Sequence, residues 1–246
     1  MNRILNEVSH RPWPLPHGPW VMAQQWHDLL FAHWRIPQEV LQRFLPGGLE
    51  LDLYHGEAWL AVVPFRMAGV RFRGLPAIPG TSSFPELNVR TYVRHRGKPG
   101  VWFFSLDASN PIAVMAARAW FHLPYFHARM NCNENANSIE YASTRIHRGA
   151  MPAEFRARYA PVGPVFQSRP GTLEHFLTER YCLFAPNNRD QILCGEIHHP
   201  PWPLQLAQAQ FAENSMATQI GITLGDPDLL HFAKRQDVVV WPAKPE

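Results

Sequence analysis

Short runs of hydrophobic residues, many of them alternating with polar ones, recur along most of the chain. Such runs are typical of β-strands, whose side chains point alternately to opposite faces of a sheet. They predict strands at residues 22–34, 49–53, 57–65, 84–93, 101–106, 138–146, 180–184, 191–198 and 237–241. Helical spacing and capping residues predict short helices near 37–45, 110–123 and 173–178. Residues 147–171 show no clear pattern, and residues 204–212 fit either period.

One predicted strand, at residues 84–93, carries a row of polar side chains. Alternation places four of them on one face, namely Glu86, Asn88, Arg90 and Tyr92. This row is either a hydrated surface or the inner wall of a polar cavity. On a hydrated surface, the neighbouring Glu and Arg would form an ion pair that adds little to stability. The next strand, at 101–106, is apolar on both faces, which places the hairpin centrally and favours the cavity.

The composition favours many short elements in a globular chain. Hydrophobic residues make up 46% and charged residues 17%, a balance that argues against disorder. Proline supplies 24 residues, and it belongs at the ends and edges of elements. We see no repeat and no linker, so residues 1–246 are predicted to form a single α+β domain built round a β-barrel or closed sheet. Residues 1–20 would be a proline-rich extended lead-in.

The charges and cysteines exclude several classes of function. A net charge of +3 is too small and too dispersed to predict a nucleic-acid partner. No apolar run is long enough for a transmembrane helix, and the N-terminus lacks an apolar signal region. Cys132, Cys182 and Cys194 have no Cys-x-x-Cys spacing, so we expect reduced, mostly buried thiols and a cytoplasmic protein.

Familiar catalytic and cofactor motifs are missing. The histidines lack metal-ligand spacing, and neighbouring His198 and His199 point to opposite faces of a strand, which leaves their roles open. Neither a nucleophile elbow nor a phosphate-binding loop occurs, so we expect no metal and no cofactor. Glu179 and Arg180 are interpreted as a structural ion pair, although Arg180 is close enough to a strand end to reach a pocket.

Several longer motifs resemble those of the DUF2071 (YqjF-like) family of bacterial proteins. They are residues 84–93 (FPELNVRTYV), 100–108 (GVWFFSLDA), 123–125 (LPY), 176–181 (FLTERY) and 198–204 (HHPPWPL). The resemblance extends over roughly residues 20 to 242. It implies an acetoacetate decarboxylase-like fold, a closed antiparallel β-barrel or cone with a central cavity.

The more distant resemblance to acetoacetate decarboxylases implies a site without their chemistry. Their glutamate before the central hairpin is similar to Glu86, which places Glu86 at the cavity. Their Pro-Lys-Lys, whose first lysine forms a Schiff base, is similar to the stretch beginning at Pro124, where Tyr125 and Phe126 replace both lysines. A phenol and a phenyl ring cannot form an imine. The chain has only three lysines, and none is expected in a cavity: Lys98, Lys234 and Lys244.

We therefore predict a cavity that binds a small organic acid or carbonyl compound. Arg90 would take the anionic end, Glu86 would act as acceptor or base, and Tyr125 as donor, with Asn88 and Tyr92 nearby. One alternative is a lysine-independent lyase, hydratase or isomerase with Glu86 and Tyr125 as catalytic groups. Another is a structural or partner-binding barrel without a ligand. The sequence leaves open whether the protein is an enzyme and whether it forms a homo-oligomer.

Overall fold

The computed structural model describes residues 2–80, 82–135, 137–187, 189 and 191–245. Within this part of the chain one sheet contains thirteen strands: β1 Met22–Ile36, β2 Glu50–Leu51, β3 Ala58–Phe72, β4 Phe84–His95, β5 Lys98–Ala108, β6 Tyr125–Asn135, β7 Ser138–Arg145, β8 Glu154–Phe166, β9 Cys182–Pro186, β10 Ile192–His198, β11 Leu204–Asn214, β12 Leu229–Val240 and β13 Lys244–Pro245. The helices are α1 Asn2–Asn6, α2 Gln38–Gln42, α3 Pro111–Phe121, α4 Leu173–Thr178 and the 3-10 turn η1 Thr218–Ile220. The protein is therefore mostly sheet, as predicted.

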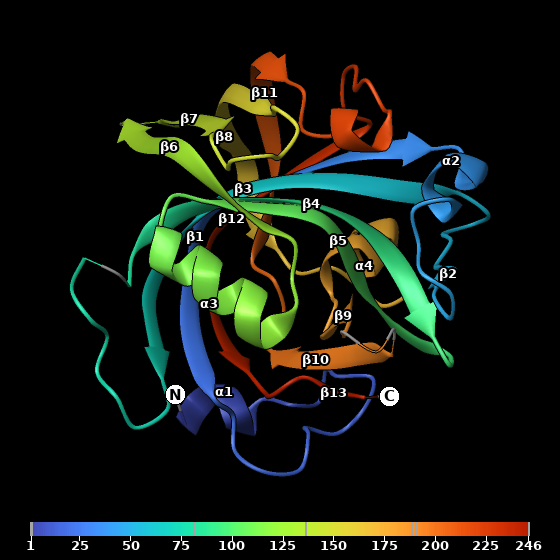
Figure 1. Ribbon diagram of the computed structural model, residues 1–246, viewed down its shortest axis with the longest axis vertical. Coiled ribbons are helices and arrows are strands. Elements are labelled where there is room, and N and C mark those ends of the chain that lie inside the picture. Colours follow the sequence, from blue (N-terminus) through green and yellow to red (C-terminus); the bar gives the residue numbers. More distant parts are fainter. Residues whose placement is uncertain (1, 81, 136, 188, 190, 246) are drawn as a thin grey trace.

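The strand pairings return to their starting point. From β5 the order runs through β6, β7, β8, β11, β12, β1, β3 and β4, and β4 pairs again with β5. Strands β9 and β10 connect β5 with β12 across this ring. Figure 1 shows the long curved strands β1, β3 and β4 crossing the molecule, with α3 in front of them.

The sheet is mixed, so the expectation of purely antiparallel pairing is wrong in one place. β5 runs parallel to both β6 and β9. Parallel neighbours need a crossover connection, and between β5 and β6 the helix α3 provides it. Asn110 starts this helix as predicted, because its Oδ1 accepts from the backbone N–H groups of Ile112 and Ala113 at 3.0 and 3.2 Å.

Strand β4 lies in the middle of the fold, as the apolar β5 indicated. It pairs with β3 on one side and β5 on the other. Leu87 and Val89 are fully buried in the main hydrophobic core, and the opposite face of the strand supplies Glu86, Asn88 and Arg90. This central placement removes the possibility that the polar row is a hydrated surface.

Several elements differ from the sequence prediction. β6 and β8 were not predicted, because β6 is largely exposed and β8 contains Pro161 and Pro164, which are rare inside strands. The strand predicted at 49–53 is only the two-residue β2, which pairs with β4. Pro37 is the N-cap of α2 and not its first helical residue. Asn2–Asn6 is helical, so the lead-in is not extended throughout.

The cysteines correct a further expectation. Cys182 and Cys194 form a disulfide across the adjacent strands β9 and β10, with their Cα atoms 6.3 Å apart. Only Cys132 is a free thiol among the described residues. The pair could not be predicted from the spacing of 12 residues, because it depends on the pairing of β9 with β10. The cytoplasmic location stays a prediction and loses the support of reduced thiols.

No helix among the described residues is long and apolar enough to cross a membrane.

Candidate functional site

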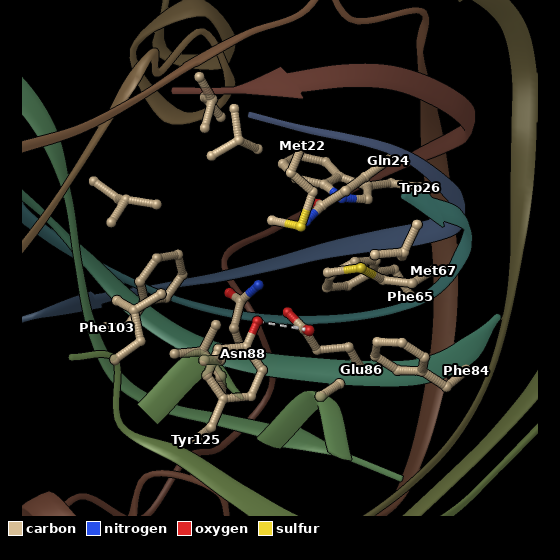
Figure 2. A pocket seen from close by; sticks show the side chains of 18 of the residues that line it. Met22, Gln24, Trp26, Phe65, Met67, Phe84, Glu86, Asn88, Phe103 and Tyr125 are labelled. Atoms are coloured by element: carbon tan, nitrogen blue, oxygen red, sulfur yellow. Dashed lines mark hydrogen bonds between the residues drawn. The ribbon is translucent and has the colours of Figure 1, made fainter. Parts of the chain in front are cut away.

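A cavity of about 330 Å³ lies against the polar face of β4. Its wall comes mainly from β1, β3, β4, β5, α3 and the connection between β3 and β4. Figure 2 shows the side chains of Glu86, Asn88 and Tyr125 turned toward one another, with Trp26 and Phe65 among those facing them. Most of the wall is apolar, so each polar group in it has a large effect on what can bind.

Glu86 is the acidic group of this wall. It is only 2% exposed. Tyr125 Oη donates to its Oε2 at 2.9 Å, and Tyr141 Oη donates to its backbone carbonyl at 2.7 Å. Burial raises the pKa of Glu86, the Tyr125 hydrogen bond opposes this shift, and the Asp107 carboxylate adds to it, with a net pKa of about 8. At neutral pH the carboxyl therefore holds a proton, and the role of Glu86 toward a ligand, as acceptor or base, stays a prediction.

Arg90 is the cationic group at the buried end of the wall. It is 9% exposed, and its Nη2 donates to the Leu177 carbonyl at 3.3 Å. The guanidinium also lies over the rings of Phe31 and Tyr92. Among the described residues no carboxylate pairs with it, and its Nε has no hydrogen-bond partner. Asn88 Oδ1 is a second buried polar atom without a partner in this wall.

Tyr92 is not on the cavity wall, although it follows Arg90 on the same face of the strand. It is fully buried and packs with Trp59 and Leu177. Its Oη lies 2.7 Å from His33 Nε2. A bulge between Val89 and Arg90 interrupts the register of β4 and β5 just before it. The predicted contact of Tyr92 with a ligand is therefore not supported.

Arg180 lines the cavity, which the sequence left open, but its charge is already compensated. Its Nη1 pairs with Asp52 Oδ2 at 2.6 Å, and the residue is 7% exposed. The predicted pair with Glu179 is wrong. Glu179 instead accepts hydrogen bonds from the Trp202 backbone N–H at 2.9 Å and from the Tyr181 hydroxyl. No sequence signal links Arg180 to Asp52, because 128 residues separate them.

The two adjacent histidines have different surroundings. His199 lines the cavity, and burial lowers its pKa to about 4, so its ring is neutral at pH 7. His198 lies off the wall, where its Nε2 is 2.9 Å from the Ile4 carbonyl and its Nδ1 is 3.4 Å from Arg11 Nη1. His198 thus holds the N-terminal segment against β10. The opposite orientations that the sequence predicted agree with these positions.

The lysines lie away from the lining residues. Lys98 Nζ pairs with Glu196 at 2.9 Å, and Lys234 Nζ pairs with Asp28 at 2.7 Å. Lys244 lies in the short strand β13 and is exposed. Within the described part of the chain, no group of three or more His, Cys, Asp or Glu side chains could hold a metal ion.

The raised pKa of Glu86 predicts an unusual pH dependence of stability. A carboxyl that binds its proton more tightly when folded stabilises the protein fully below the unfolded pKa, near 4.5, and this contribution is lost as pH rises to about 8. Between these values the free energy of unfolding of the wild type should fall relative to Glu86→Gln by up to about 1.4 kcal/mol per pH unit. Urea unfolding from pH 5 to 8 measures this. If the free energies of unfolding of the wild type and Glu86→Gln change with pH in parallel, the prediction is contradicted. The control is Glu134→Gln, since Glu134 is exposed and its replacement should leave the pH dependence of the wild type unchanged.

Comparison of the sequence with known proteins identifies its relatives. Residues 23–237 match the family model of DUF2071, described as an uncharacterized conserved protein. The uncharacterized protein YqjF of Bacillus subtilis (strain 168) is 46% identical over 231 residues, which cover 94% of this chain and 94% of that protein.

Comparison of the structure gives the fold. Acetoacetate decarboxylase from Legionella pneumophila superposes with a TM-score of 0.63 at 16% identity, covering 99% of this chain and 94% of that one. The enduracididine biosynthesis enzyme MppR, complexed with the condensation product of pyruvate and imidazole 4-carboxaldehyde, gives a TM-score of 0.62 at 12% identity, covering 93% and 90%. The fold is therefore acetoacetate decarboxylase-like.

Proposed function

The chain belongs to the DUF2071 family, and from that premise we propose that it binds a small organic acid or carbonyl compound in its cavity without Schiff-base decarboxylation. The observation that carries this proposal is the Arg90 guanidinium. It is buried in the cavity wall, its Nε makes no hydrogen bond, and no described carboxylate pairs with it. A buried charge without a counter-ion is costly, so a ligand carboxylate at this place would stabilise it.

The absence of Schiff-base chemistry is supported by the wall itself. An imine needs an amine, and no lysine is among the described lining residues. Tyr125 stands in the stretch that resembles the Pro-Lys-Lys of the decarboxylases, and its hydroxyl is engaged with Glu86. We further propose that the ring of strands is a closed barrel, with neither nucleic acid nor membrane as a partner.

An enzyme is the second candidate, favoured by the contact between Glu86 and Tyr125. The carboxyl is protonated at neutral pH and lies 2.9 Å from the phenol, so the pair could donate a proton to a bound carbonyl oxygen. If this lyase, hydratase or isomerase activity exists, Glu86→Gln should lose turnover and keep binding. A purely structural barrel is disfavoured, because the polar row is not closed by ion pairs and borders a void.

The proposed binding is testable with a thermal-shift series. We expect 2-oxo and 2-hydroxy acids such as pyruvate and lactate, at 100 times their Kd, to stabilise the protein by about 2.7 kcal/mol. Uncharged amides of the same size should stabilise it less, because they lack the charge that Arg90 would accept. Borohydride treatment with pyruvate should leave the mass of the protein unchanged. A covalent adduct would overturn the exclusion of Schiff-base chemistry, and no shift with any acid or carbonyl compound would overturn the binding proposal.

A further inference from the structure

We propose that the ligand is an amphipathic monocarboxylic acid, with its carboxylate at Arg90 and an unbranched apolar chain directed to an open mouth beside α3. This inference rests on the proposed function and names the class of acid. We define the mouth by four lining side chains that are also exposed, Phe72, Leu75, Ile78 and Ile112.

The charges of the lining fit a single negative group. Besides Arg90 the charged lining residues are Arg71, Glu86 and Arg180. Arg180 pairs with Asp52, which also pairs with the solvent-exposed Arg94, so the excess positive charge of these three residues lies at the surface. Buried Glu86 holds its proton at neutral pH. Arg71 is only half-buried, and its Nη1 donates to the Gly69 carbonyl at 3.2 Å. One buried and uncompensated positive charge remains, which a monoanion would neutralise without bringing a second charge into the apolar wall.

The geometry of β4 separates the two ends of the cavity. Alternate residues Phe84, Glu86, Asn88 and Arg90 all line it. At about 3.3 Å per residue, six residues place Phe84 roughly 20 Å from Arg90. Phe84 follows directly on the connection that carries Leu75 and Ile78, so it marks the end near the mouth. A ligand with its acid at Arg90 therefore extends toward the mouth as its chain grows.

The path between these ends is apolar and has room for a chain. Phe65, Met67 and Phe103 border it from the strands, and α3 contributes only small side chains along part of its length, Ala113, Ala116 and Ala117. Glu86 and Asn88 are the polar groups on this stretch of β4, and a neutral carboxyl can face an alkyl chain or a carbonyl oxygen. The lining is thus mostly apolar outward from Arg90, with Glu86 and Asn88 as the polar groups that β4 contributes along it.

The exposed side chains of the mouth are a separate reason to expect a ligand with a long alkyl chain. Phe72, Leu75, Ile78 and Ile112 are 44, 59, 64 and 59% exposed. Large apolar side chains gathered on one rim are the usual mark of a binding surface, because water contact with them is unfavourable. A three- or four-carbon acid held at Arg90 would leave them uncovered. Only a chain that spans roughly the 20 Å between Arg90 and Phe84 would reach them.

The test is calorimetric titration of the full chain at pH 7 with straight-chain acids from butanoate to hexadecanoate. Affinity should rise by up to about fourfold for each added methylene until the chain fills the apolar path. Ile112→Ser, at the mouth, should weaken hexadecanoate about threefold or more and leave butanoate unchanged. Met115→Ser is the matched control, because Met115 is 64% exposed on the same helix but does not line the cavity. Octan-1-ol should bind at least tenfold more weakly than octanoate.

The outcomes separate this inference from the function on which it rests. If butanoate and hexadecanoate bind equally well, the chain-length inference is overturned and acid binding stands. Equal weakening of both acids by Ile112→Ser would also overturn it. If no acid or carbonyl compound binds at all, both proposals fail together.

Discussion

Arg90→Met is expected to weaken the binding of a carboxylic acid about 30-fold or more, because it removes the buried partner of the ligand's charge. Methionine has a similar length and suits the surrounding rings of Phe31 and Tyr92, so the fold should persist. Calorimetric titration of octanoate gives the affinity, and thermal unfolding checks that the variant is folded. Arg90→Lys keeps a positive charge and should retain part of the affinity.

The matched control is Arg71→Met, which removes the half-buried arginine of the same cavity. Octanoate binding should change little in this variant, since the carboxylate is expected at the other end of β4. The reverse result, a large loss with Arg71→Met and little with Arg90→Met, would place the acid near the mouth. That outcome would contradict the orientation we propose.

Arg145→Met is expected to lower the free energy of unfolding by about 3–5 kcal/mol, because it leaves a buried carboxylate without its partner. Arg145 Nη2 lies 2.7 Å from Asp107 Oδ1, and the two side chains are 1% and 0% exposed. Arg145 Nη1 also donates to Gln219 Oε1 at 2.8 Å, and the guanidinium lies over the ring of Phe126. Urea unfolding measures the loss. Asp107→Asn combined with Arg145→Met should recover part of it.

An exposed ion pair is the control for this effect. Arg35 pairs with Asp228 at 2.6 Å, but its side chain is 55% exposed. Arg35→Met should therefore cost at most about 1 kcal/mol. Equal losses in Arg35→Met and Arg145→Met would show that burial of the Asp107–Arg145 pair is not what makes it important.

The sequence placed the polar row of β4 correctly because strand alternation is strict. Glu86, Asn88 and Arg90 all face the cavity, and the apolar neighbouring strand was enough to make β4 central. The same alternation places Tyr92 on the cavity face, but Tyr92 packs with Trp59 and Leu177 instead. The bulge that precedes it in the pairing of β4 with β5 has no recognisable residue pattern. Tyr125 was placed by resemblance alone, because it lies on a different strand, β6, which periodicity did not reveal.

Features that depend on contacts between distant parts of the chain could not be predicted from the sequence. The compensation of Arg180 by Asp52 and the disulfide between Cys182 and Cys194 both follow from how strands are brought together. The protonation of Glu86 at neutral pH depends on burial and on Asp107, which no residue pattern in the sequence shows. The mouth could not be predicted either, because isolated apolar residues in a loop look the same whether exposed or buried.

The most direct test of the central claim is a crystal structure of the protein soaked with octanoate. We expect density inside the cavity, with the carboxylate within hydrogen-bond distance of Arg90 Nε and the alkyl chain running along Asn88 and Glu86 in the direction of Phe84. An empty cavity, or an octanoate bound with its carboxylate at Arg71 and its chain inward, would contradict the account.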